Sequence, residues 1–171
     1  MRNFHSPGRS SIYSRNGMVA TSHPIATKVA IDALNNGGNA IDAALAAAFV
    51  MPICEPHMTG LFGDMFALIK LKNSTELIGL NSSGKSPAKL NSGFLRDKGM
   101  TKIPSESVHA ITLPGAIKGL ERLAQDYSNL GLSTACNPAI FYSEKGIPIA
   151  PRVAFDWGNN APLLQGLARK F

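Results

Sequence analysis

Apolar residues recur at four-residue spacing through Ile25, Val29 and Ala33, which places them on one face of a helix. His23-Pro24 precedes this run, and proline suits the first helical position because the N–H that it lacks would have no partner there. Gly37-Gly38 follows the run and supplies the left-handed backbone that commonly ends a helix. The pattern therefore predicts a helix that begins at the proline and stops before the glycine pair.

A second helix is predicted immediately afterwards, and its side chains have little bulk. Asn39 can cap its amino end, where Asp42 in the first turn is favoured by the helix dipole and by amide groups without partners. Six of the nine residues 40–48 are alanine, so another backbone can approach closely. Pro52 predicts the end of the helix, which we expect to be buried against a sheet.

Short apolar runs separated by turn residues predict the strands. Residues 65–71 and 76–80 flank Asn73-Ser74, so we expect an antiparallel hairpin there. Residues 18–21 and 108–113 are also apolar enough to form strands. Further helices are predicted over 92–98, 116–127 and 133–145, the last of them closed by Gly146. This order of elements favours an α+β fold over alternating βα units.

Composition indicates one domain or a piece of a larger one. The chain has 171 residues, of which 44% are hydrophobic and 16% charged, unlike a disordered protein. Residues 1–17 are polar and basic and predict an extended lead-in, whereas 18–171 carry the packing patterns. The longest apolar run, 43–53, is shorter than the ~20 residues of a membrane span, and no secretory signal is visible. We therefore expect a soluble, cytoplasmic chain that does not contact a membrane.

Charge and cysteine content narrow the classes of partner and cofactor. The net charge of +6 permits an anionic partner, but the basic residues are scattered and aromatic residues do not interleave with them, so nucleic-acid binding is not expected. Cys54 and Cys136 lack the spacing of metal ligands or of a redox pair, and the four histidines are dispersed. We expect neither a metal nor a cofactor.

The best candidate for a ligand site is the segment that follows the hairpin. Asn81, Ser82, Ser83 and Lys85 place a carboxamide, hydroxyls and one cation within five residues. Such a set can hold a small anionic or amide-bearing ligand through several hydrogen bonds. The alternative is a solvated exit from the hairpin, whose polar residues only satisfy the turn.

A second candidate is the glycine-rich stretch 59–66. Gly60 and Gly63 flank Asp64 and could turn backbone N–H groups toward a ligand, although they could equally allow a tight bend. The spacing matches neither a dinucleotide fingerprint nor a P-loop. His57 could form a catalytic pair with Glu55 or with the aspartate, but an isolated loop histidine is more often structural.

Seven stretches in order resemble the gamma-glutamyltranspeptidase family of N-terminal-nucleophile hydrolases. Together they span most of residues 9–171, and the ordered combination is specific although each motif alone is weak. The stretches are GMVATSHP (17–24) with AT (26–27), GGNAIDAA (37–44), EPHMTGLFGDMF (55–66), LPGA (113–116), NPA (137–139), EKG (144–146) and PRVAFDW (151–157).

The resemblance implies a fold and a partner. Family members are precursors that cleave themselves into a large and a small subunit, and the new terminal threonine of the small subunit attacks an amide carbonyl. This chain resembles the start of the large subunit, so the family places the nucleophile beyond Phe171 and we expect no catalytic residue within the chain. It would form an incomplete part of an αββα sandwich, bind a small-molecule amide and need the small subunit or C-terminal portion as its partner.

The resemblance also bears on the substrate. Members that handle gamma-glutamyl compounds carry an arginine in the loop after the second hairpin strand, and that position falls at Ser83 here. A hydroxyl cannot reproduce the bidentate fork of a guanidinium, and Lys85 lies two residues away. The loop is more similar to the branch that includes oxamate amidohydrolase and related acylases. Phe62 also departs from the glycine that is common in the family.

Three functional hypotheses follow. The first is the amino-terminal portion of a gamma-glutamyltransferase-like amidohydrolase, which hydrolyses or transfers a gamma-glutamyl or related small acyl group and is inactive without the rest. The second is a non-catalytic subunit or truncated relic that folds only with a separate small-subunit partner. The third is a basic ligand-binding module, which salt-dependent binding to heparin would reveal.

Overall fold

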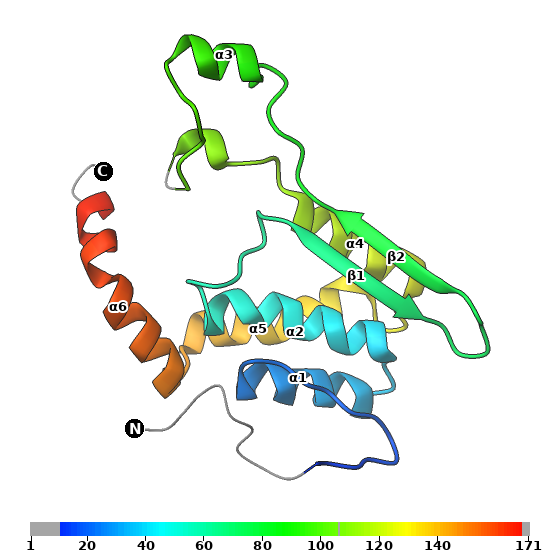
Figure 1. Ribbon diagram of the computed structural model, residues 1–171. Helices are drawn as coiled ribbons and strands as arrows, with labels where there is room; N and C mark the ends of the chain where they lie inside the picture. The colour runs from blue at the N-terminus through cyan, green and yellow to red at the C-terminus, as the bar shows by residue number, and fades with distance from the viewer. Residues whose placement is uncertain (1–10, 106, 169–171) are drawn as a thin grey trace.

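The computed structural model describes residues 11–105 and 107–168, with side chains described as far as residue 160. Helices dominate and an antiparallel hairpin lies beside them (Figure 1). In chain order the elements are α1 (Pro24–Asn35), α2 (Ala40–Cys54), β1 (Met65–Lys70), β2 (Leu77–Ser82), α3 (Ser92–Asp97), a 3₁₀ turn (Val108–Ala110), α4 (Gly115–Tyr127), α5 (Gly131–Lys145) and α6 (Pro151–Ala168).

The first two helices confirm their predicted starts. The ring Nδ1 of His23 accepts a hydrogen bond from Ile25 N (3.2 Å) directly ahead of α1. At α2 the Asn39 carboxamide accepts from Asp42 N (3.1 Å), and the Asp42 carboxylate accepts from Asn39 N (2.8 Å), which completes a capping box. Both helices therefore begin where side chains satisfy their first amide groups.

The carboxyl end of α2 differs from expectation, and its packing differs in part. Pro52 lies inside the helix, which continues to Cys54 because Met51 still accepts from Glu55 N (2.7 Å). The main neighbours of α2 are α1 and α5, and its buried Ala43 and Ala47 pack with alanines of α1. The expected contact with the sheet is present as well, since Leu45 and Phe49 of α2 share a buried cluster with Ile69 of β1. The small side chains permit a close helix pair as readily as a helix–sheet contact.

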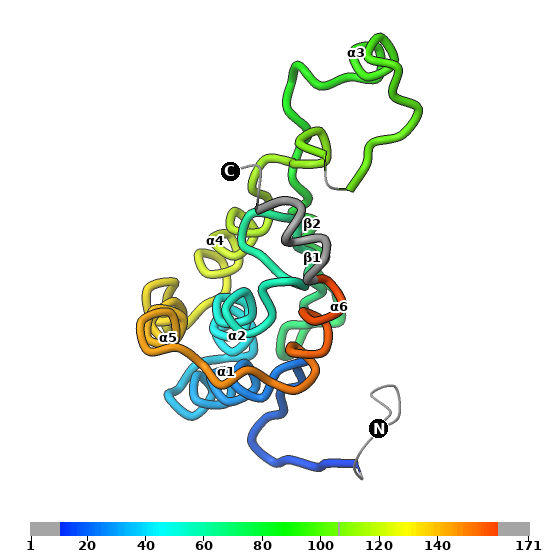
Figure 2. Tube along the Cα trace, turned by 90° about the vertical axis from the view of Figure 1, so that its left-hand side faces the viewer, coloured from blue at the N-terminus to red at the C-terminus, as the bar shows by residue number. Residues whose placement is uncertain are grey.

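The predicted hairpin is confirmed, and α4 covers its inner face (Figures 1 and 2). Its register pairs Met65 with Ser82 at one end and Lys70 with Leu77 at the other. The second strand runs two residues further than expected, so Asn81 and Ser82 end β2 and do not belong to the loop. The reason is the full six-residue pairing with β1.

The hairpin of β1 and β2 therefore forms a sheet that helices cover on one face. Alternate residues of the hairpin face inward, and Ile69 joins Leu45, Leu120 and their neighbours in a buried cluster. On the opposite face Phe66 and Leu68 are 67% and 76% exposed. The mixture of helix and antiparallel sheet agrees with the α+β class. The described residues form one two-stranded sheet, so the αββα sandwich, which has two sheets, stays a prediction.

Two predicted strands are wrong. Residues 18–21 are extended, but the structure pairs them with no strand in the described part of the chain. Residues 108–110 form a 3₁₀ turn, which Ser107 caps by accepting from His109 N (3.2 Å), within an arm that carries α3 away from the body (Figure 1). The apolar pattern was present in both segments, but no strand among the described residues offers partners for their backbone groups.

The predicted helices over residues 92–98, 116–127 and 133–145 are confirmed as α3, α4 and α5, and Gly146 closes the last with a φ of 77°. The sequence did not predict α6. Of the predicted lead-in, residues 1–10 lie outside the described residues, and 11–17 carry neither helix nor strand. Among the described helices, none combines the length and apolar character that crossing a bilayer demands.

Candidate functional site

The predicted site residues lie where β2 ends against the start of α4. Gly63 O accepts hydrogen bonds from Gly115 N (3.1 Å) and Ala116 N (2.7 Å), and Leu61 O accepts from Ile117 N (3.0 Å). Ser82 Oγ donates to Gly115 O (2.7 Å). The segment before β1 therefore supplies the acceptors that the first turn of α4 needs, and it fixes the helix relative to the hairpin.

The loop after β2 is held from two sides. Asp64 Oδ1 accepts a hydrogen bond from Gly84 N (2.6 Å), and Lys85 O accepts one from Leu113 N (2.9 Å). From the end of β2, Asn81 Oδ1 accepts a hydrogen bond from Ser83 N (3.0 Å). These bonds fix the backbone while the side chains of Ser83 and Lys85 stay exposed.

Two glycines allow the loop after β2 to lie close to the backbone before and at the start of α4. A Cβ atom on Gly84 would lie 2.0 Å from Leu113 O, and one on Gly115 would lie 2.4 Å from Ser82 O. Both neighbours are backbone atoms, which cannot rotate away as a side chain could. By contrast, a Cβ on Gly60 or Gly63 would meet nothing within 4 Å, so space alone does not demand glycine there.

The predicted residues meet, but with different roles. Ser82 is half-buried and its hydroxyl is engaged by α4, whereas Asn81 shapes the loop and Ser83 and Lys85 offer their side chains to solvent. Asp64, which the sequence placed in a separate glycine-rich candidate, belongs to the same junction. Their roles in binding substrate stay a prediction, and neither of the two large cavities is lined by this loop.

His57 does not pair with Glu55 or Asp64. Its Nε2 lies 3.4 Å from Asp156 Oδ2, and its Nδ1 accepts a hydrogen bond from Trp157 Nε1 (3.1 Å), so both ring nitrogens are engaged by α6. Arg152 Nε also donates to Asp156 (2.8 Å), and this bond, together with the charge of Arg152 and the hydrogen bond from His57, lowers the pKa of that carboxyl. We interpret His57 as a clamp for α6 and not as a base.

Sequence reasoning missed this clamp, although one signal was available. Arg152 and Asp156 stand four residues apart with opposite charges, a spacing that supports a helix. Their contact with His57 spans about a hundred residues and has no local signature.

Substituting leucine for His57 tests the clamp. We expect the free energy of unfolding to fall by about 1–2 kcal/mol, because Trp157 Nε1 loses its acceptor and α6 loses its tie to the turn. Urea unfolding can be followed through the fluorescence of Trp157, the only tryptophan in the sequence. The matched control is His109→Leu, since His109 makes an edge contact with Phe94, and a change within about 0.5 kcal/mol is expected. Equal urea midpoints for the two variants would contradict the clamp.

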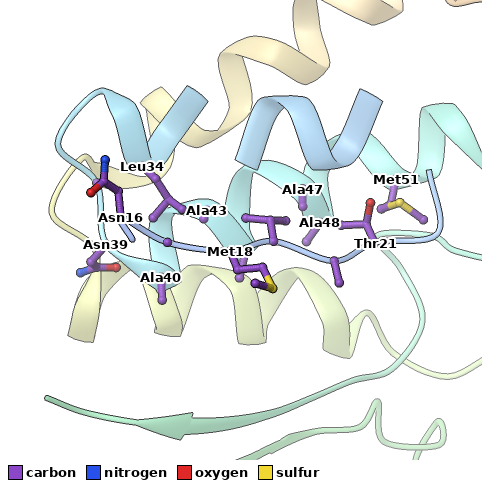
Figure 3. A pocket seen from close by; sticks show the side chains of 15 residues that line it. Asn16, Met18, Thr21, Leu34, Asn39, Ala40, Ala43, Ala47, Ala48 and Met51 are labelled. Carbon is purple, nitrogen blue, oxygen red and sulfur yellow. The ribbon is translucent and has the colours of Figure 1, made fainter. Parts of the chain in front are cut away.

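A cavity of about 750 Å³ lies beside α2 (Figure 3). The extended segment 16–21 forms one wall, and Ala40, Ala43, Ala47 and Ala48 of α2 form the other. Its walls are mainly apolar and expose no convergent charged groups. Within the described residues, no three His, Cys, Asp or Glu side chains gather in a way that could hold a metal ion.

Solved structures with this arrangement are N-terminal-nucleophile hydrolases. The chain is similar to a cephalosporin acylase from Bacillus halodurans with a TM-score of 0.87 and 38% identity, over 96% of this chain and 31% of that one. It is also similar to the gamma-glutamyltranspeptidase of Helicobacter pylori with a TM-score of 0.80 and 32% identity, over 88% of this chain and 44% of that one. The fold of the chain is thus that of the matching part of these two structures.

Sequence comparison then gives the family. The family model of gamma-glutamyltranspeptidase matches residues 26–170, and the chain belongs to this family. A glutathione hydrolase proenzyme from Bacillus subtilis (strain 168) is 35% identical over 139 residues, which is 79% of this chain and 24% of the relative. The chain therefore spans about a quarter of the length of that relative. The resemblance found in the sequence is confirmed.

Proposed function

We propose that the chain forms part of an enzyme that hydrolyses a small amide or transfers its acyl group, with residues 83–85 as one wall of the substrate pocket. Family membership supports the reaction class, since the similar proteins are a glutathione hydrolase proenzyme, a gamma-glutamyltranspeptidase and an acylase. The single observation that carries the site is the fixed loop: its backbone is bonded at Gly84 and Lys85, while two polar side chains remain exposed.

Within this proposal, Lys85 binds an anionic group of the acyl moiety. An ammonium on a flexible stem acts as a point charge and pairs with a carboxylate from several directions. Ser83 adds one hydroxyl, which can donate or accept a single hydrogen bond. The substrate of this site is then a small amide with a carboxylate on its acyl part, of which a gamma-glutamyl group is one example.

The nucleophile belongs, in the proposal, to a small subunit or C-terminal portion. Its hydroxyl attacks the amide carbonyl, the amine leaves, and the acyl-enzyme is resolved by water or by an acceptor amine. Ser83 and Lys85 only bind and orient the acyl group. Because the nucleophile lies in the other portion, the 171-residue chain alone is inactive.

An assay with acyl nitroanilides tests the proposal. The 171-residue chain, alone and together with the product of the complete reading frame, is incubated with the gamma-glutamyl, glutaryl and butyryl compounds. We expect no release by the chain alone, and release by the complete protein from the two anionic compounds in preference to the neutral butyryl compound. Lys85→Met should raise KM about tenfold for the anionic compounds with little change in kcat, because the lost charge pair acts in binding.

Lys89→Met, on the same exposed stretch, is the matched control and should leave KM unchanged. Turnover by the 171-residue chain, or a Lys85→Met variant with unaltered KM for the anionic compounds, would overturn the proposal. A complete protein without activity would favour the non-catalytic subunit or relic.

A further inference from the structure

A second large cavity, of about 710 Å³, lies where the amino end of α6 meets the residues around the start of α1. Its walls come from segment 22–24, the turn 55–58 and residues 150–156. It shares no residue with the end of β2 or with the loop 83–85, so it is separate from the site proposed above. Apolar groups of Pro24, Met58 and Val153 make up part of the lining.

The side chain of Glu55 is the unusual feature of this cavity. The residue is only 9% exposed, yet it lines the open space. Its Oε2 accepts a hydrogen bond from Ser22 Oγ (2.8 Å). Its Oε1 accepts no hydrogen bond among the described residues and is not one of their fully enclosed polar atoms, so it is open to the cavity. Glutamate is seldom buried to this degree unless it is paired, since desolvating a carboxylate carries a large free-energy penalty.

The other charges at the cavity are already balanced. Arg152 donates to Asp156 (2.8 Å), and His57 contacts the same carboxylate. No Lys, Arg or His side chain in the described part of the chain forms an ion pair with Glu55. Its negative charge acts on the neighbouring residue: burial, together with this charge, raises the pKa of the Cys54 thiol to about 11.

We propose that this cavity binds a small organic primary ammonium. The ammonium group donates to Glu55 Oε1, and its apolar body lies against Met58 and Pro24. A charge-assisted hydrogen bond of this kind would replace water at the carboxylate oxygen that is open to the cavity. The same chemistry could come from a lysine elsewhere in a longer protein, and the experiment separates the two sources.

The probe is benzylammonium, with benzyl alcohol as its neutral counterpart. Isothermal titration at pH 7 into the 171-residue chain should show saturable binding of the amine, and at least about tenfold weaker binding of the alcohol. Glu55→Gln keeps the shape and the bond to Ser22 but removes the charge, so we expect affinity for the amine to fall about tenfold. Glu76→Gln, an exposed carboxylate on the hairpin, is the matched control and should leave affinity unchanged.

Ser22→Ala provides a second variant in case the glutamine variant does not fold. It keeps the charge and frees Oε2, so binding of the amine should persist or strengthen. Equal affinity for amine and alcohol, unchanged affinity in Glu55→Gln, or lost affinity in Ser22→Ala would each overturn the proposal. So would binding by the 171-residue chain but not by the complete protein, which would assign the site to an internal lysine. None of these results bears on the acyl-binding loop.

Discussion

Asp42→Asn is expected to lower the free energy of unfolding by about 3 kcal/mol. The carboxylate of Asp42 is 1% exposed and accepts four hydrogen bonds: from Ser128 Oγ, Asn129 N (3.1 Å), Leu130 N (3.0 Å) and Asn39 N (2.8 Å). An asparagine would turn an NH₂ group toward some of these donors and leave them without acceptors. The substitution weakens both the amino end of α2 and the turn between α4 and α5, because the Asp42 side chain accepts hydrogen bonds from both.

The pH dependence of stability gives an independent check. Burial raises the pKa of Asp42, but the hydrogen bonds from Ser128 and three backbone amides outweigh it, and the pKa falls below its ordinary 3.8. The unfolded chain therefore takes up the proton at a higher pH than the folded chain does. The stabilisation is fully present above about pH 4 and is lost as the pH falls through the folded pKa.

Urea unfolding at pH 7 and at pH 3 measures both the stability lost in Asp42→Asn and its dependence on pH. The difference between the native chain and Asp42→Asn should be largest at pH 7 and should shrink at pH 3. Asp32→Asn is the matched control, because Asp32 forms an exposed ion pair with Lys28 on α1 and should change stability by less than about 0.5 kcal/mol. A loss no larger than that of the control would show that the four hydrogen bonds do not stabilise the fold as described.

Gly84→Ala is expected to lower kcat/KM of the complete enzyme by about a hundredfold, on the premise that the loop binds substrate. The added Cβ would lie 2.0 Å from Leu113 O and 2.6 Å from Thr112 Oγ1, so the loop must move by roughly 1 Å. Such a shift breaks the bond from Gly84 N to Asp64 and moves Ser83 and Lys85 away from the acyl group.

Gly79→Ala is the control for this substitution. Gly79 lies on β2, five residues earlier, and its added Cβ would make an ordinary contact of 3.8 Å with Leu68. Activity and urea midpoint should both stay close to those of the unaltered protein. If Gly84→Ala kept full kcat/KM toward the gamma-glutamyl anilide, the loop would not be part of the substrate pocket.

The elements that the sequence predicted correctly are those with local causes. His23, directly before Pro24, and Asn39 mark helix starts by accepting hydrogen bonds from residues within three positions, and Gly146 marks a helix end through its own backbone conformation. The hairpin likewise follows from two apolar runs around a short turn. These signals need no knowledge of distant partners.

The errors fall where a distant partner decides. Residues 18–21 and 108–113 have strand patterns, but a strand needs a neighbour whose position no local pattern specifies. The site shows the same limit: the loop residues were found by composition, whereas the bond from Gly84 to Asp64 joins residues twenty positions apart. His57 was noticed, but its partners lie on α6, which was not predicted.

The hydrogen bonds at the start of α4 should tolerate amino-acid replacements in the segment before β1 better than insertions or deletions. Gly63 and Leu61 contribute main-chain oxygens, which any residue type carries, so point replacements along this stretch leave the bonds in place. An insertion or deletion of one residue would offset the oxygens from the amides and tilt the helix against the hairpin. In related proteins, insertions and deletions should therefore be rarer in this segment than amino-acid replacements.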